Sequence, residues 1–174
     1  METAERLQSQ LLELRQSFDR GFSDPVSAGA PERENLLAIR LGPDPYALRL
    51  SEVAALGADR TITPLPSDRP ELLGIAGLRG AIVAVYDLAR LLGKASSETP
   101  RWLALAQGSL TAFAFSGFEG QLQLPLDAVA RAQDPGQRGL FEVVRDAGVS
   151  RPLIHLPALI LALDERPIRT GKVG

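Results

Sequence analysis

The sequence of 174 residues contains no cysteine and a single histidine, His155. Without cysteine the chain has no disulfide, no thiolate nucleophile and no zinc–thiolate site. One imidazole cannot build a histidine metal cage, and it leaves few routes to acid–base catalysis. These absences predict no metal, no cofactor and no catalytic residue, so the protein is expected not to be an enzyme.

Clusters of positive charge are also missing. The 19 lysine and arginine residues are balanced by 21 aspartate and glutamate residues, which gives a net charge of −2. Lys94 and Lys172 are the only lysines, and the arginines are scattered along the chain. Binding to a nucleic-acid backbone or an anionic lipid surface needs clustered cations. Nucleic acid and membrane partners are therefore not expected.

Long hydrophobic runs are absent as well. The richest apolar stretch, 153–163, includes His155 and Pro157 and falls short of the roughly 20 residues that a membrane-spanning helix needs. The first residues carry acidic side chains where a secretory signal needs a basic start and an unbroken apolar stretch. We therefore expect a cytoplasmic protein without direct membrane insertion.

The chain opens with an amphipathic segment. An apolar residue recurs every three or four positions from Leu7 to Phe18, which predicts a helix with one apolar face over 3–20. Residues 21–34 are rich in Gly, Ser, Pro and Ala and are expected to form a flexible linker. The helix can pack on its own domain or associate with a second copy of the chain, and the sequence leaves both open.

From Asn35 the pattern changes to short apolar runs separated by turn residues. The runs 36–41 and 46–50 flank a Gly-Pro-Asp-Pro turn, which is typical of a hairpin. Asp87 is placed to cap a helix that ends at Gly93. Further strands are predicted at 79–85, 102–106, 110–116, 121–126, 141–144 and 153–156, before a helix that starts at Pro157. Many short strands favour small barrels or a sandwich over alternating βαβ units.

The densest local motif is the run from Gly74 to Gly80, with the sequence GIAGLRG. It lacks the lysine of a phosphate-binding loop, and an apolar strand follows it where a dinucleotide fingerprint needs a helix. A KH-type clamp would need flanking helices and a basic surround. Tight turns explain the glycines by themselves. Arg79 either ties loop carbonyls together or presents a charge to a partner.

Two other groups allow more than one interpretation. His155 lies in an apolar stretch, where a single imidazole is more typical of a hydrogen-bonded residue near the core than of a ligand. Phe113, Phe115 and Phe118 are candidates for a ligand site. Phe113 and Phe115, however, alternate along one strand face, which is typical of a half-buried core strand.

The order of motifs in residues 35–93 resembles the CheW family of chemotaxis adaptors. It runs from an opening strand through a second strand at YAL, a segment at Val53, a proline-bounded loop, a G-x-x-x-L-R-G turn, an apolar strand and an Asp-Leu helix start. The remainder resembles the family more loosely. Ala84 stands where the family commonly has proline, Ala89 where an arginine often follows, and Ser116 where an aspartate is expected.

This resemblance implies a mainly β fold of two interlocked, five-stranded SH3-like β-barrels with short helices and, in this chain, an extra N-terminal helix. The CheW-like domain would cover 35–165, with the first barrel at about 35–93, the second at about 100–155 and a C-terminal helix. Residues 1–34 would be the additional helix and linker, and 166–174 a tail.

The resemblance also implies a function without catalysis. Family members are adaptors of chemosensory arrays that bind the regulatory domain of a CheA-type histidine kinase and the cytoplasmic tip of a methyl-accepting chemoreceptor. By position in the family pattern, the protein-binding residues would be Val53, Ala55, Leu56, Arg79, Gly80 and Asp87. The alternative is that the second barrel has diverged into a small-molecule or peptide sensor whose site is lined by the three phenylalanines.

Overall fold

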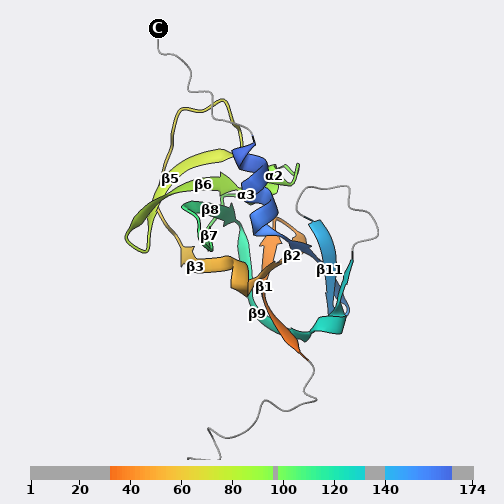
Figure 1. Cartoon of the computed structure of the whole chain (residues 1–174). Coiled ribbons are helices and arrows are strands. Elements are labelled where there is room, and N and C mark those ends of the chain that lie inside the picture. The colour runs from red at the N-terminus through yellow and green to blue at the C-terminus, as the bar shows by residue number, and fades with distance from the viewer. Residues whose placement is uncertain (1–31, 96–97, 132–139, 166–174) are drawn as a thin grey trace, which may run out of the picture. The chain divides into compact units, whose positions relative to one another are not determined.

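A computed structural model describes residues 32–95, 98–131 and 140–165 of the chain, which are built mainly from β-strands (Figure 1). The described strands form two six-stranded sheets. The predicted N-terminal helix, most of the predicted linker and the predicted tail lie outside the described residues.

The first sheet, sheet A, is antiparallel except for the parallel pair of β12 with β2. In spatial order its strands are β10 (Val129–Arg131), β11 (Leu140–Asp146), β12 (Val149–Ile154), β2 (Asp44–Arg49), β1 (Arg33–Leu41) and β9 (Gly117–Pro125). The β1–β2 pairing confirms the hairpin that was predicted around the Gly-Pro-Asp-Pro turn.

The second sheet, sheet B, is likewise antiparallel except for the parallel pair of β6 with β8. In spatial order its strands are β3 (Val53–Ala58), β7 (Trp102–Ala106), β8 (Thr111–Phe115), β6 (Ala81–Asp87), β5 (Leu72–Leu78) and β4 (Ile62–Thr63). β5 and β6 form a hairpin whose turn is Arg79-Gly80.

Each sheet combines strands from 35–93 with strands from 100–155. Strands β7 and β8 come from the second predicted barrel but pair within sheet B, whereas β1 and β2 come from the first but pair within sheet A. Each sheet also has six strands where five per barrel were expected. Four pairings join the two parts of the chain: the parallel pairs β12–β2 and β6–β8 and the antiparallel pairs β1–β9 and β3–β7.

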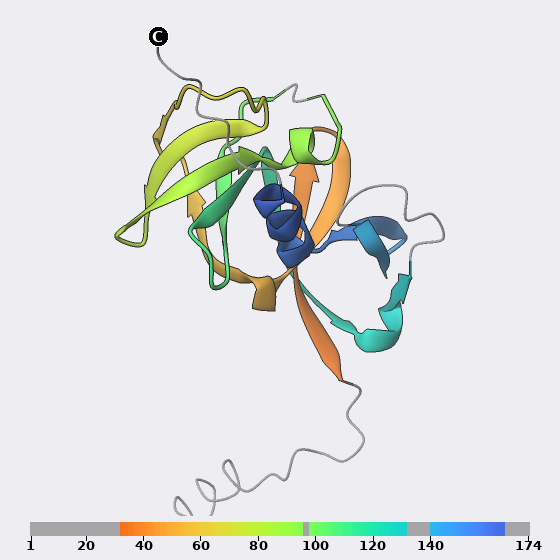
Figure 2. The ribbon, with the colours of Figure 1, turned by 45° about the horizontal axis from the view of Figure 1, so that its top comes forward.

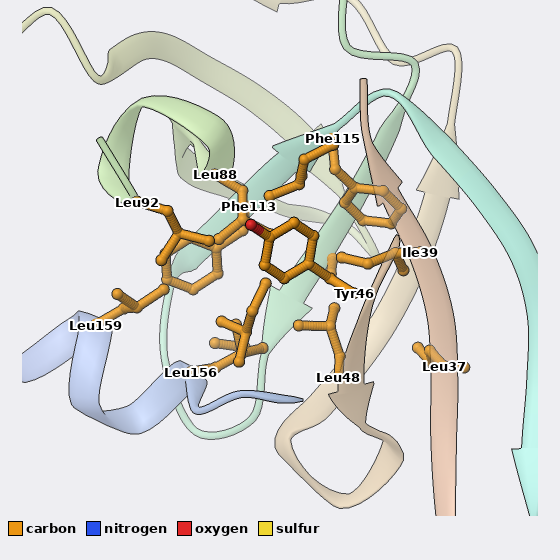
Figure 3. Close-up of a cluster of buried hydrophobic side chains, with 14 of the residues drawn as sticks. Leu37, Ile39, Tyr46, Leu48, Leu88, Leu92, Phe113, Phe115, Leu156 and Leu159 are labelled. Carbon is orange, nitrogen blue, oxygen red and sulfur yellow. The ribbon is translucent and has the colours of Figure 1, made fainter. Parts of the chain in front are cut away.

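The main core lies between the two sheets and under the last helix (Figure 3). Leu37 and Ile39 of β1 meet Phe113 and Phe115 of β8 there, and Leu156 closes the cluster from the helix. All five side chains are buried. Burial of side chains of this size contributes about 1.5–3 kcal/mol each, so this cluster holds the two sheets together.

Short helices complete the described fold. They are η1 (Leu50–Glu52), α2 (Leu88–Leu91), η2 (Leu126–Ala128) and α3 (Leu156–Asp164). The Asp87 carboxylate caps α2 as predicted. Pro157 occupies the first turn of α3, where its missing N–H costs no hydrogen bond. Among the described helices none is long and apolar enough to cross a membrane.

Candidate docking surface

The β5–β6 hairpin is shaped by glycines at two positions. Gly74 has φ +144°, and a Cβ built on it would lie 2.0 Å from the Thr63 carbonyl oxygen of the neighbouring strand. Gly80 has φ +77° in the turn. Gly80 therefore fits the tight-turn interpretation, and Gly74 requires glycine because β4 approaches it closely. The same interpretation was applied to Gly77, where it is wrong, because Gly77 has neither a positive φ nor a close neighbour.

Arg79 ties the turn of this hairpin to strand β3. Its Nη1 atom donates a hydrogen bond to the Ala54 carbonyl oxygen over 2.7 Å. The pairing of β3 with β7 shifts register between Val53 and Ala55, which takes Ala54 out of the ladder and leaves its carbonyl for the arginine. The first of the two interpretations of Arg79 is thereby confirmed. The residue is also exposed, so part of its guanidinium faces solvent.

The candidate residues of β3 lie beside this hydrogen bond and are half-buried. Val53 and Leu56 pack against the core between the sheets, whereas Ala55 packs against the smaller core of sheet B. A partner that docks here would meet the strand that carries them rather than freely exposed side chains.

Two large apolar side chains at the same end of sheet B were not singled out from the sequence. Ile82 of β6 is 70% exposed and Leu110 of the β7–β8 turn is 64% exposed. The Ala84 N–H donates to the Leu110 carbonyl oxygen over 2.9 Å, which joins that turn to β6. We call this region the hairpin end of sheet B, defined by Val53, Arg79, Gly80, Ile82 and Leu110.

Asp87 does not belong to the hairpin end, because it lies at the opposite end of β6 from Arg79. Its side chain is buried, and Oδ1 accepts a hydrogen bond from the Arg90 N–H over 3.2 Å. Oδ2 lies 3.6 Å from Arg90 Nε. The carboxylate is thus occupied by capping α2, and it lines a shallow pocket together with Phe115 and Ser116.

His155 and Glu52 connect α3 to the start of β3. His155 Nδ1 accepts a hydrogen bond from the Ala158 N–H over 3.2 Å, and Glu52 Oε2 accepts one from the Leu156 N–H over 2.8 Å. His155 Nε2 lies 3.6 Å from Glu52 Oε1. The predicted interpretation of His155 as a hydrogen-bonded residue near the core is confirmed. Glu52 was missed, because a single glutamate after a serine carries no local signal.

Arg49 extends this polar group into sheet A. Its Nε atom lies 2.5 Å from Glu34 Oε1 and its Nη2 atom bonds to Glu142, while Nη1 is 3.9 Å from Glu52 Oε1. Burial alone would lower the pKa of Arg49, but the hydrogen bonds to Glu142 and Glu34 outweigh it and raise the pKa. Arg49 therefore stays charged and joins β1, β2, β11 and η1.

Glu119 of β9 pairs with two arginines of sheet A, Arg40 of β1 and Arg151 of β12. Its Oε1 lies 2.6 Å from Arg40 Nε and its Oε2 lies 2.6 Å from Arg151 Nη1. The Arg151 contact is an ion pair without hydrogen-bond geometry, since Nε and Nη1 of this buried residue have no hydrogen-bond partner in the described part of the chain. The hydrogen bond from Arg40, helped by Arg151 and opposed by burial, lowers the pKa of Glu119.

The three phenylalanines do not surround a common cavity. Phe113 and Phe115 are buried in the core between the sheets. Phe118 packs against Trp102, with ring centroids 5.1 Å apart. Of the three, only Phe115 contributes to the shallow pocket beside Asp87. Across 32–95, 98–131 and 140–165 no group of three or more His, Asp or Glu side chains is arranged to hold a metal ion.

The family model that describes the CheW-like domain matches residues 35–163 of the sequence. The chain belongs to the CheW-like family. Its structure is similar to the crystal structure of the scaffolding protein TtCheW from Thermoanaerobacter tengcongensis, with a TM-score of 0.64 and 16% sequence identity. That likeness covers 73% of this chain and 92% of the other, and it shows a shared fold. The comparison with curated proteins gave no match.

Two departures of this CheW-like domain from the family pattern have a structural explanation. Ala84 uses its N–H in the bond to Leu110, and a proline at this position would lack that donor. Ser116 Oγ accepts from the Gly42 N–H over 2.9 Å and donates to the Arg40 carbonyl oxygen over 3.1 Å. Ser116 therefore fixes the β1–β2 turn. Nothing in the structure explains Ala89.

Proposed function

We propose that this CheW-like protein is a non-enzymatic adaptor that couples a CheA-type histidine kinase to the cytoplasmic tips of chemoreceptors. The observation that carries the proposal is the CheW-like domain over 35–163. The hairpin end of sheet B supports it, because an exposed cation at Arg79 lies at the same end of the sheet as the exposed apolar side chains of Ile82 and Leu110. Arginine and apolar anchors are the residue types that dominate binding energy at interfaces.

An adaptor of this kind works by differential affinity. It transmits information only if it binds one state of its partner more tightly than another, and the coupling between its two sites equals that difference in free energy. No bond needs to be made or broken. The hydrogen bond from Arg79 to Ala54 suits this function, because it fixes the hairpin turn to the backbone of β3.

The hairpin end is the proposed receptor-facing surface. Arg79, Gly80 and the β3 residues Val53, Ala55 and Leu56 are assigned to it by their place in the family pattern. Ile82 and Leu110 are added because of their exposure. Asp87 is proposed to affect partner binding indirectly, by holding α2 in place. We assign the kinase regulatory domain to a different surface, so that both partners can bind at once.

Further proposals concern the organisation of the protein. We propose that the two sheets correspond to the SH3-like barrels of the family, that the protein works in the cytoplasm, and that the residues before β1 are a separate helix and linker able to mediate self-association. The sensor alternative is not carried forward, because Phe113 and Phe115 are core residues.

Binding measurements on the immobilised full chain test the proposal. The isolated cytoplasmic hairpin of a chemoreceptor and the kinase regulatory domain, both from the same genome, are titrated separately. We expect both to bind in the micromolar range. Ile82→Ser is expected to lower the affinity for the receptor hairpin by about tenfold or more, which corresponds to about 1.4 kcal/mol of binding free energy. Leu161→Ser on α3 is the matched control, since Leu161 is 66% exposed. Absence of binding to both folded partners would contradict the proposal.

A further inference from the structure

Arg151 of β12 is one of two buried charged side chains among the described residues, and the other is Asp87. The Asp87 carboxylate caps α2. Arg151 has no such role, because its Nε and Nη1 atoms are enclosed and have no hydrogen-bond partner in the described part of the chain. Buried donors without partners lower the stability of a fold. Stability therefore does not explain why a charged residue stands at position 151.

Glu119 gives Arg151 a negative charge without giving it a hydrogen bond. Its Oε2 lies 2.6 Å from Arg151 Nη1 but outside hydrogen-bond geometry. Its Oε1 accepts a hydrogen bond from Arg40 Nε over 2.6 Å. In the pairing of β9 with β1, Glu119 is the extra residue of a β-bulge, and bulges re-aim side chains. The carboxylate thus lies where an anion would bind Arg151, but it leaves the arginine donors unpaired.

The group formed by Arg40, Glu119 and Arg151 is open to solvent on the side of Arg40. The side chains of Arg40 and Glu119 are 44% and 30% exposed, whereas that of Arg151 is 11% exposed. Arg40 Nη1 also donates to the Pro43 carbonyl oxygen over 2.7 Å, which keeps its guanidinium in place. Two guanidinium groups share one carboxylate, so positive charge is in excess. We call these three residues the two-arginine site.

Arg49 in the same sheet has the opposite balance of charge. It is surrounded by the carboxylates of Glu34, Glu52 and Glu142. Its Nε and Nη2 atoms donate hydrogen bonds to Glu34 and Glu142. Negative charge is in excess there, and an added anion would be repelled. An excess of positive charge and unpaired buried donors therefore distinguish the two-arginine site from the other arginine cluster of sheet A.

We infer that the two-arginine site binds a small oxyanion, a phosphate or carboxylate group, which takes the place of Glu119 beside Arg151. Guanidinium groups hold such anions through parallel N–H donors. A free anion can align with the donors that Glu119 leaves unpaired, and its charge balances the excess positive charge. Glu119 competes with the anion for the same position.

The two-arginine site is separate from the proposed receptor-facing surface. In both ribbon views β11 and β12 lie on the opposite side of α3 from the β5–β6 hairpin (Figures 1 and 2). The inference goes beyond the adaptor function and does not rest on it, because the ligand is a small anion and its binding is measured without a protein partner.

Calorimetric titration of the full chain tests the site. Inorganic phosphate and malonate are the probes, each in a chloride buffer of constant ionic strength. Wild type is expected to bind at least one of them with a dissociation constant in the millimolar range or below. Glu119→Gln should bind that probe more tightly, because the competing charge is gone. Arg151→Met should bind it about tenfold more weakly or worse, since the charged donor is lost.

Arg145→Met is the matched control, because it removes the same charge from an exposed position of the neighbouring strand β11. It should bind the probes like wild type. Melting temperatures give a second readout, since a ligand of the folded chain raises them. The bound probe should raise the melting temperature of Glu119→Gln more than that of wild type. Phosphate also stabilises proteins by exclusion from their surface, and the shift in Arg151→Met measures that contribution.

Each outcome decides for or against the site. Arg151-dependent binding of phosphate alone, of malonate alone or of both supports it and names the class of ligand. Equal affinity of wild type and Arg151→Met overturns the inference, and so does absence of binding in both wild type and Glu119→Gln. A loss in Arg145→Met as large as that in Arg151→Met would show a general effect of charge and also overturn it. If Arg151→Met does not fold, Arg40→Met decides by the same comparison.

Discussion

Glu52 Oε2 accepts a hydrogen bond from the Leu156 N–H over 2.8 Å, and this contact joins the beginning of β3 to the beginning of α3. The main chain of Glu52 is held as well, because its carbonyl oxygen accepts from the Gln107 N–H over 2.8 Å. The residue that immediately precedes Val53 is therefore fixed from two sides. The candidate docking strand and the helix that covers the core are therefore joined directly.

Removal of the Glu52 carboxylate should destabilise the fold. Glu52→Ala leaves the Leu156 N–H without its acceptor, and such a loss costs about 1–3 kcal/mol of unfolding free energy. Glu52→Gln keeps an acceptor and should lose less. Denaturant unfolding followed by circular dichroism measures both, with Arg101→Ala as the control.

Arg101 suits this control because it pairs with Asp59 on the surface, where both side chains are 63% exposed. Exposed pairs of this kind contribute about 0–1 kcal/mol. Equal losses of unfolding free energy in Glu52→Ala and Arg101→Ala would show that the bond to Leu156 does not matter for stability.

Phe113 should be the costliest single truncation in the core between the sheets. Its side chain is fully buried among residues of both sheets and α3 (Figure 3). Phe113→Ala is expected to lower the unfolding free energy by about 3–5 kcal/mol through lost burial and a residual cavity. The matched control is Phe118→Ala on the half-buried Trp102 pair, which should lose clearly less. A larger loss of unfolding free energy in Phe118→Ala than in Phe113→Ala, measured by chemical denaturation, would contradict the central position of Phe113 in the core.

Gly74 and Gly80 should respond differently to alanine. In Gly74→Ala the new Cβ would lie 2.0 Å from the Thr63 carbonyl oxygen, so β4 or β5 must move. In Gly80→Ala there is open space, and only the positive φ is unfavourable, at about 1–2 kcal/mol. Thermal melts of the two variants should show the larger loss for Gly74→Ala. Equal losses of melting temperature would mean that β4 moves away from the new Cβ without destabilising the fold.

The ion pairs of Glu119 predict a pH dependence. Its pKa is lowered in the folded protein, so its pairs with Arg40 and Arg151 contribute stability above its ordinary value of 4.5. That contribution is lost as the pH falls through the lowered pKa. Glu119→Gln should therefore be less stable than wild type at neutral pH, and the difference should shrink under acid. Unfolding free energies of both proteins across the acid range check this, and a difference that stays constant with pH would contradict it.

Local signals in the sequence predicted much of the fold but not its connections. The β1–β2 hairpin and the cap at Asp87 follow from turn and capping residues near each other in the chain. The parallel pairing of β6 with β8 depends on contacts between distant residues, which no local pattern encodes. This is why the sequence did not predict that each sheet combines strands from both parts of the chain.

The candidate site was likewise predicted only where a local motif marks it. Arg79 was recognisable from its motif, and the structure adds that it binds Ala54. The exposure of Ile82 could not be foreseen, because alternation along β6 shows which face it shares with Ala84 but not how far that face is covered. Glu52 became apparent only when α3 was seen to begin beside it.

The most direct test of the adaptor account is a ternary binding measurement. The chemoreceptor hairpin is immobilised, and the kinase regulatory domain is passed over it with and without the full chain. The account predicts that the kinase domain is retained only when the chain is present and that Ile82→Ser greatly reduces the retention. Equal retention of the kinase domain in the absence of the chain would contradict the account.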